Sequence, residues 1–334
     1  MNIIFTSVEA GIIYGLMVLG VYLTFRILDF PDLTVDGSFV TGAATSAVLI
    51  INGVHPILAT LASVVVGFLA GTLTGLLHTK GKINALLSGI LVMIALYSIN
   101  LRIMGKSLIS LFNETTIFTM TTNFFESLSI DQTLNQWFPF FQAKTWSVLF
   151  IMTVVLIVIK KLFDWFLSTE IGLAIRAVGS NESMIKSFSG NTDRFKILAL
   201  GISNALVALS GSFIAQYNGF SDMGMGTGLI VIGLASVIIG ESIFGTKNII
   251  RTTLAVIGGS IVYRLIVGLA LRVEFLETGD LKLITAIIVI VALVTPKMLQ
   301  ARRERVAKKQ RFFEKMKINQ EVSHATNKES IQSI

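Results

Sequence analysis

The sequence predicts an all-α polytopic membrane protein with about eight to ten transmembrane helices, some of them broken or re-entrant. Three observations predict this class. Of the 334 residues, 53% are hydrophobic and only 14% are charged, whereas a soluble domain carries about 25% charged residues. The mean hydropathy is +0.77. Apolar stretches of the length that crosses a bilayer, about 20 residues, recur along the chain.

The expected membrane spans follow this length rule. They occupy roughly 7–26, 34–52, 56–77, 83–101, 147–167, 195–216, 227–245, 252–271 and 281–299. The stretches 34–52 and 227–245 are the weakest, because both are rich in Gly, Ser and Thr and begin with polar residues. Helices of that kind can be broken where they line a cavity instead of lipid.

Basic residues predict the orientation, because loops rich in Lys and Arg stay in the cytoplasm. From Lys297 to Lys317 the sequence has nine Lys or Arg against two Glu, a balance of 9 − 2 = +7. We therefore expect a cytoplasmic C-terminus. Residues 1–299 form the membrane domain, and 300–334 form a basic cytoplasmic tail that is partly disordered. Further inner loops are expected near 80–82, 160–196 and 247–251.

The chemistry of an enzyme is missing. Gly81-Lys82 resembles the end of a phosphate-binding loop, but Ile83 replaces the Ser or Thr of that motif. The chain has no cysteine, and its three His are far apart in sequence. We expect no enzymatic activity and no cofactor or metal bound by this chain. The net charge of +7 is assigned to cytoplasmic loops and not to nucleic-acid binding.

The inner loop at about 168–190 predicts two short helices around a bend. Ser168 or Thr169 can cap the first helix, and Gly179 can end it in a left-handed conformation. A second helix can begin after Ser180 or Asn181 and present apolar residues on one face, namely Met184, Ile185 and Phe188. A docking segment explains this succession of helix, bend and apolar helix face better than a solvated basic connector does.

Here the sequence resembles a known family. The pattern from Gly172 through Arg176-Ala177-Val178-Gly179 to Asn181 is similar to the cytoplasmic coupling segment of branched-chain amino acid permeases, which belong to binding-protein-dependent ABC transporters. The segments Asp29–Phe39, Leu96–Gly105 and Ile239–Gly245 also resemble this family, and the similarity runs from about residue 5 to 299.

The resemblance implies a type II-like ABC importer permease in a bacterial plasma membrane. Its partners would be a cytoplasmic ABC ATPase dimer carrying ATP and Mg, an extracytoplasmic solute-binding (lipo)protein, membrane lipid, and a second permease copy or a paralogue. Residues 1–299 would be the permease domain, forming a pathway for an amino acid or similar small solute. The residues expected to couple it to the ATPase are Gly172, Arg176, Ala177, Gly179, Asn181 and Glu182.

The segment Asp29-Phe-Pro-Asp32 departs from the better-known branched-chain permeases, which carry an Asn-Phe-Ala-His-type sequence there. This departure favours a subgroup that resembles systems for aromatic amino acids, so the solute class is aromatic or branched-chain. The polar residues of this region are candidates for the pathway or its inner mouth, with a cytoplasmic turn as the alternative, because carboxylates at membrane depth are costly. They are Asp29, Asp32, Thr34, Asp36 and Ser38.

Two further charged residues lie in apolar stretches and are expected to have structural roles. Glu241 can pair with Lys247 or Arg251. Arg264 can snorkel to the interface or find an internal partner such as an acidic residue. A stripe of small residues at Gly67, Gly71 and Gly75 indicates close helix packing within the chain more than dimerisation.

Two features leave alternatives open. The outer loop at roughly 102–146 contains an aromatic stretch that can anchor at the membrane interface or dock an external partner. Broken helices and buried carboxylates would also suit an ion-gradient-driven secondary transporter, and a membrane scaffold without transport is the third hypothesis. The missing nucleotide motif and the inner loop favour the ABC permease.

Overall fold

The computed structural model describes residues 2–127, 146–187 and 190–270, with isolated positions between 283 and 294. The chain divides into two compact units, Met1–Ala286 and Ile287–Ile334. All helices and strands given below belong to the first unit. The predicted tail and nearly all of the predicted span 281–299 lie outside the described residues.

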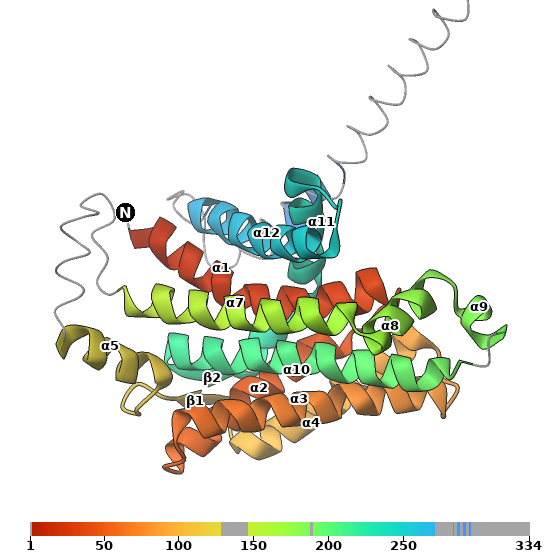
Figure 1. Ribbon diagram of the computed structural model, residues 1–334. Coiled ribbons are helices and arrows are strands. Elements are labelled where there is room, and N and C mark those ends of the chain that lie inside the picture. Colours follow the sequence, from red (N-terminus) through yellow and green to blue (C-terminus); the bar gives the residue numbers. More distant parts are fainter. Residues whose placement is uncertain are drawn as a thin grey trace, which may run out of the picture. The chain divides into compact units, whose positions relative to one another are not determined.

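Long helices dominate the first unit (Figure 1). They are α1 (Asn2–Val21), continued by the π-helix η1 (Tyr22–Ile27), then α2 (Thr34–Ile51), α3 (Pro56–Thr79), α4 (Ala85–Met104), α7 (Ser147–Ser168), α10 (Thr192–Asn218), α11 (Leu229–Phe244) and α12 (Ile249–Ala270). Within the described residues, seven helices are long and apolar enough to cross a membrane. Helix α7 has 22 residues but carries Lys160, Lys161 and Asp164. The prediction of an all-α polytopic membrane protein is confirmed.

Helix α10 lies at the centre of the bundle, packed against α1, α2 and α3. The predicted stripe of small residues on α3 makes this packing possible. A Cβ at Gly67 would overlap Ala208, and one at Gly71 would overlap the carbonyl oxygen of Leu200. Because this close approach joins two helices of one chain, the prediction of internal packing is confirmed.

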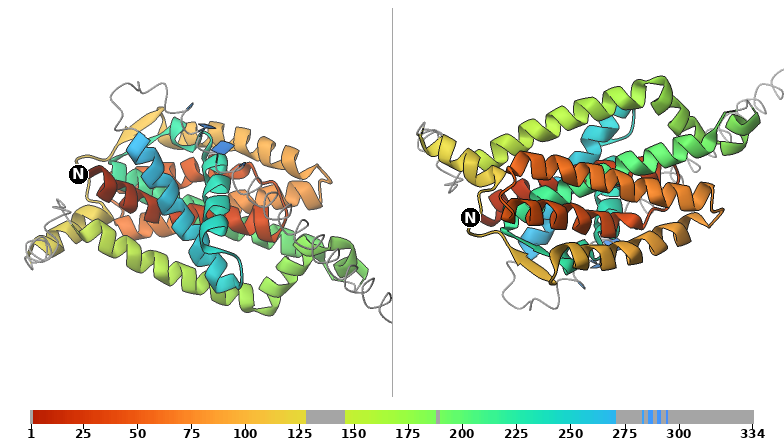
Figure 2. Two further views of the ribbon diagram at one scale, coloured as in Figure 1. Left: turned by 90° about the horizontal axis from the view of Figure 1, so that it is seen from above. Right: turned by 90° about the horizontal axis from the view of Figure 1, so that it is seen from below.

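Helices α11 and α12 form a pair on the side of α1 opposite α10, and α11 runs across the direction of the long helices (Figure 2, left). Small residues again allow the contact. A Cβ at Gly240 would overlap the carbonyl oxygen of Ala255, and one at Gly259 would overlap that of Ser236. The hydroxyl of Ser260 donates to the Gly11 carbonyl at 2.8 Å, which ties α12 to α1.

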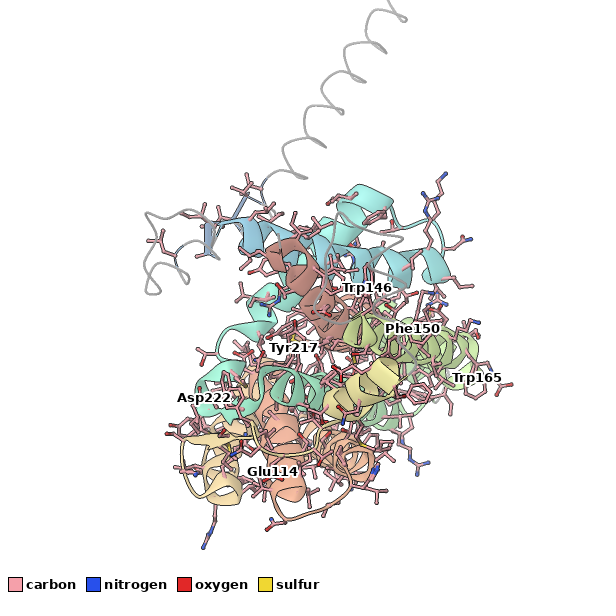
Figure 3. The ribbon with its side chains drawn as sticks, turned by 90° about the vertical axis from the view of Figure 1, so that its left-hand side faces the viewer. Glu114, Trp146, Phe150, Trp165, Tyr217 and Asp222 are labelled. Carbon is pink, nitrogen blue, oxygen red and sulfur yellow. The ribbon has the colours of Figure 1, made fainter. Side chains whose placement is uncertain are left out.

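One end of the first unit carries a short two-stranded ladder and an amphipathic helix, and the opposite end carries the short helices α8 (Glu170–Ser180) and α9 (Glu182–Ser187) (Figure 1). Strand β1 (Leu108–Ser110) pairs antiparallel with β2 (Phe220–Asp222), and α5 spans Ile117–Ser127. Figure 3 looks onto this end, with Tyr217 in its interior; the Tyr217 hydroxyl donates to Glu9 Oε2 at 2.9 Å. Phe124 is exposed, and most of the predicted aromatic stretch lies outside the described residues.

Two interruptions in the helices lie close together, because Asp36, in the first turn of α2 after the first interruption, accepts a hydrogen bond from Gly228 at the end of the second. The first is the linker after η1, where Asp29 has a φ of +55° and the chain turns into α2. The second is the extended and 3-10 stretch through β2 and η2 (Met223–Gly226), which ends at Gly228 with a φ of +80°. The predicted span 34–52 is itself an unbroken helix, because the break falls before it; the span 227–245 is interrupted at its start.

Candidate functional site

The inner loop folds as two short helices, as predicted: α8 (Glu170–Ser180) and α9 (Glu182–Ser187). Thr169 caps α8 by accepting a hydrogen bond from the backbone N–H of Gly172 at 3.3 Å. Asn181 caps α9 through its Oδ1, which accepts from the Met184 N–H at 3.0 Å. Such caps satisfy N–H groups that have no partner within the helix.

The expected role of Gly179 as a left-handed helix end was wrong. Helix α8 continues through Gly179 to Ser180, and residue 179 is not among those with positive φ. Glycine is instead required by packing, because a Cβ at this position would overlap the carbonyl oxygen of Ile27 at the end of η1. The inner loop therefore rests directly on the backbone of the first membrane helix.

Glu182 joins α9 to the start of α10. Its Oε1 lies 2.8 Å from the Lys196 ammonium and 2.9 Å from that of Lys186. Hydrogen bonds from these two ammonium groups lower the pKa of Glu182 to about 2. The carboxylate is thus ionised at neutral pH and holds the second short helix against α10.

The other predicted coupling residues differ in exposure. Gly172 is buried in the tight turn from α7 to α8, where a Cβ would overlap the Phe166 carbonyl oxygen. Arg176 and Ala177 are half-buried, and Asn181 is exposed. Large apolar side chains on this surface are also exposed, namely Ile171, Leu173 and Met184. Phe188, expected on the same face, lies outside the described residues.

A cavity of about 890 Å³ lies beside α8, between η1, α7, α11 and α12. Its polar lining includes Tyr22, Arg26, Asp164, Arg176, Glu241 and Lys247. Arg26 Nε donates to Glu241 Oε1 at 3.0 Å, and Lys160 pairs with Asp164. Within the described part of the chain, Arg176 and Lys247 form no ion pair.

The expected pairing of Glu241 with Lys247 or Arg251 was wrong, because Glu241 lies on the α11 face that contacts η1 and meets Arg26 there. Arg251 donates its Nε–H to the carbonyl oxygen of Phe244 at 3.0 Å instead. This interaction places a cation at the C-terminal end of α11, where the helix dipole favours it. Glu241 consequently ties the end of α11 to the π-helix.

Three of the predicted pathway residues lie in helix contacts. Asp32 Oδ2 accepts from Asn204 Nδ2 at 2.7 Å, and Ser38 Oγ donates to Asn204 Oδ1 at 2.6 Å. Thr34 Oγ1 lies 2.7 Å from Thr74 Oγ1. Asp32, Thr34 and Ser38 are all fully buried. These bonds connect the linker and α2 to α3 and α10, so the geometry supports a structural use of these three side chains.

Asp36 is placed differently, at the meeting point of the two helix interruptions. Its Oδ2 accepts from the Gly228 N–H and its Oδ1 from the Ile230 N–H, both at 2.9 Å. A carboxylate at a helix N-terminus is stabilised by the unpaired N–H groups and the dipole there. Asp36 is half-buried and lines a second cavity. Asp29 is exposed.

Arg264 has an aromatic partner. Its guanidinium carbon lies 3.5 Å from the centre of the Tyr14 ring, and Tyr14 stacks on Phe39 with ring centres 5.8 Å apart. The expected acidic partner is not found among the described residues. The Nε of Arg264 is buried there without a hydrogen-bond acceptor.

Sequence reasoning missed Asn204, Asn100, Arg26 and Tyr14. Asn204 and Asn100 are amides inside long apolar helices, where an unpaired polar group is costly, so that signal could have identified them. Arg26 and Tyr14 carried no comparable signal, because each gains its role only from a residue more than 200 positions away in sequence.

The bundle of apolar helices, with two interruptions and a two-helix loop at one end, defines a polytopic membrane protein. Residues 3–294 match the family model described as "Branched-chain amino acid transport system / permease component". The chain therefore belongs to this ABC permease family, whose members are transport subunits and not enzymes, and it is a multi-pass membrane protein.

Three relatives illustrate the range of the similarity. A tyrosine transport system permease protein of Clostridioides difficile (strain R20291) is 44% identical over 295 residues, which cover 88% of this chain and 92% of that protein. An uncharacterised protein of Rickettsia prowazekii (strain Madrid E) is 32% identical, with 89% and 99% covered. The ribose import permease of Escherichia coli (strain K12) is 23% identical, with 76% and 74% covered. No solved structure matches the chain with statistical significance.

Proposed function

We propose that this chain is the membrane-spanning subunit of an ATP-driven importer that carries an aromatic amino acid, with tyrosine as the first candidate. The solute class is supported by the 44% identity to a tyrosine transport system permease protein and by the departure of the Asp29–Asp32 segment from the branched-chain pattern. An external solute-binding protein delivers the solute, and a second permease copy or paralogue completes the pathway. ATP and Mg reside on a separate cytoplasmic ATPase dimer.

The contact between Gly179 and Ile27 carries the coupling proposal. The ATPase docks on α8 and α9, where Ile171, Leu173 and Met184 offer exposed apolar contacts. Since the backbones of α8 and η1 are in contact, a rigid-body movement of α8 displaces η1. π-Helical turns are rare and often mark functional positions. The π-helix η1 leads directly into the linker that holds Asp32, and this linker leads into the first turn of α2, which holds Asp36.

The topology supports a cytoplasmic position for this end. Arg176 and Lys247 line one cavity, although they belong to different predicted inner loops. The ring of Phe30, in the linker after η1, packs edge-on against His78 at 5.0 Å, which brings the end of α3 to the same side. The three predicted inner loops thus gather together, and the C-terminus is assigned to the cytoplasm on the basis of its positive charge.

The test is uptake in proteoliposomes that contain the permease, its ATPase and its binding protein. We expect ATP-dependent uptake of tyrosine by the complete complex. Uptake by this chain alone, abolished by collapsing an ion gradient and unaffected by ATP, would instead establish a secondary transporter.

Substitutions in the loop test the docking surface. Arg176→Glu and Asn181→Pro are expected to uncouple ATP hydrolysis from uptake while the protein remains in the membrane. Proline at 181 removes the N–H that Asn181 donates to Ala177. Arg194→Glu, the same charge change on an exposed residue at the start of α10, serves as the control. Equal effects of Arg176→Glu and Arg194→Glu would contradict docking at Arg176.

A further inference from the structure

A second cavity, of about 430 Å³, opens between α2, α4 and η2. This volume lies within the range of small-molecule sites, which are mostly apolar with a few placed polar groups. The lining follows that pattern. It includes Asp36, Met93, Tyr97, Ser98, Asn100 and Met223.

Asn100 supplies the clearest sign of a missing ligand. Its side chain is fully buried, and its Nδ2 donates to the Gly37 carbonyl at 3.3 Å. Its Oδ1 accepts no hydrogen bond among the described residues. A buried acceptor left without a donor costs about 1–3 kcal/mol. A ligand that brings N–H donors into the cavity would remove that cost.

Asp36 adds negative charge to the same cavity. A carboxylate has about four acceptor sites on its two oxygens. The N–H groups of Gly228 and Ile230 occupy one site on each oxygen, and the N–H of Leu229 also interacts with the carboxylate. Acceptor capacity therefore remains on this carboxylate, which lines the cavity. A buried amide oxygen beside a carboxylate matches an ammonium group, which has three donors and a positive charge.

The rest of the lining matches a large apolar side chain. The exposed Tyr97 lines the cavity together with Met93 and Met223. Methionine sulfur and aromatic rings form favourable contacts with a further ring. The lining thus combines acceptors for an ammonium group with a surface for an aromatic group.

Lipid is a poor occupant of this cavity. Its wall includes Asp36 and the non-helical backbone at Gly226 and Thr227, and irregular backbone at membrane depth is tolerated only where protein covers it or it lines an aqueous cavity. A charged side chain in hydrocarbon is likewise costly. Under the proposed function, this face therefore borders the water-filled pathway, and the second permease copy or paralogue covers it.

We infer that the cavity between α2, α4 and η2 is a solute-binding site on the pathway, in which Asn100 Oδ1 and the Asp36 carboxylate accept hydrogen bonds from the ammonium group of an aromatic amino acid. The inference rests on the proposed transport function and specifies where the permease itself recognises its solute.

The chain contains no cysteine, so a single introduced cysteine is the only thiol of the permease, and its modification is measured on the separated permease chain. Ser98→Cys places a thiol in the cavity lining, and Ile99→Cys places one on the neighbouring residue, which is exposed but does not line the cavity. In proteoliposomes of the assembled complex, a water-soluble methanethiosulfonate reagent should modify the Ser98→Cys thiol at least tenfold faster. Equal slow modification of both would place the cavity against lipid and overturn the inference.

Protection by small molecules tests the recognition. Millimolar tyrosine or tyramine, which both carry the ammonium group, should slow modification of Ser98→Cys and leave Ile99→Cys unchanged. 3-(4-Hydroxyphenyl)propionate, which lacks that group, should not protect. Adding Asn100→Leu to Ser98→Cys should abolish protection, whereas adding Asn100→Asp, which retains the acceptor, should preserve it. Protection by the propionate equal to that by tyrosine, or protection unaffected by Asn100→Leu, would overturn the inference.

The two proposals fail separately. If the complex that contains the unmodified permease shows no ATP-dependent uptake of tyrosine, the proposed function fails whatever the thiols report. If it does take up tyrosine but neither tyrosine nor tyramine protects Ser98→Cys, the transport function stands and the binding site is refuted.

Discussion

Gly179 of α8 lies against Ile27 so closely that its missing side chain is what allows the contact. A glycine of the inner loop is thereby packed on the last residue of the π-helix. The two segments cannot approach in this way with any larger residue, so this position joins the proposed docking surface to the first membrane helix.

Gly179→Ala should consequently disturb coupling more than its size suggests. The added methyl group must displace η1 or α8, and overpacking of this kind costs about 1–3 kcal/mol. We expect reduced ATP-dependent uptake at an unchanged level of protein in the membrane. Ser180→Ala, at the exposed neighbouring residue, should behave as wild type. Full uptake by Gly179→Ala would show that α8 and η1 can separate without consequence.

Asn204→Leu should destabilise the bundle, because it removes the donor that Asp32 Oδ2 uses and leaves a buried carboxylate less satisfied. Hydrogen bonds to charged groups contribute about 1.5–3 kcal/mol. We expect the free energy of unfolding to fall by about that amount, which should appear as a lower midpoint temperature of the purified complex. Ser203→Ala, which removes a neutral bond to the Gly20 carbonyl, should cost less. Combining Asp32→Ala with Asn204→Leu should cost less than the sum of the two single changes.

Asp36→Leu should loosen the start of α11, because the N–H groups of Gly228 and Ile230 lose their acceptor. Hydrogen–deuterium exchange of these two amides should become faster by about tenfold or more, which corresponds to about 1.4 kcal/mol. Asp36→Asn keeps one acceptor oxygen and should have an intermediate effect. Exchange elsewhere in α11, beyond its first turn, is the internal control. Unchanged exchange at both amides would show that Asp36 does not hold the helix end.

The sequence predicted the helices well, because each of the first eight expected spans is a mostly apolar run of about the length that crosses a bilayer. The cap at Thr169 was also predictable, since it depends on residues three positions apart. What could not be predicted was set by tertiary contacts. Gly179 is a packing residue only because Ile27 lies over it, and Glu241 meets Arg26 only because α11 crosses η1.

The ion pairs of Glu182 predict an acid-dependent release of α9. Its pKa is lowered from 4.5 to about 2 by Lys196 and Lys186. A lowered pKa means that the stabilisation is complete above about pH 4.5 and is lost as the pH falls toward 2. Amide exchange in Glu182–Ser187, corrected for the intrinsic effect of pH, should rise over that interval. Glu182→Gln should exchange faster at neutral pH and show no such rise; a parallel rise in this variant would assign the transition to another group.

Replacing Tyr14 and replacing Arg264 with leucine should change the stability of the protein in opposite directions. Tyr14 holds a guanidinium against its ring, and a desolvated cation–π contact contributes about 2 kcal/mol. Tyr14→Leu should therefore lower the thermal stability, whereas Tyr14→Phe, which keeps the ring, should stay close to wild type.

Arg264→Leu removes a cation whose Nε has no acceptor in the described part of the chain, and a cation at membrane depth costs about 2.5–3.5 kcal/mol. That variant should be as stable as wild type or more so. If Arg264→Leu instead unfolds the protein, Arg264 has a stabilising partner beyond Tyr14. If the Arg264→Leu variant folds but loses uptake, the arginine has a role in transport, because the variant then shows that the protein does not need this side chain for stability.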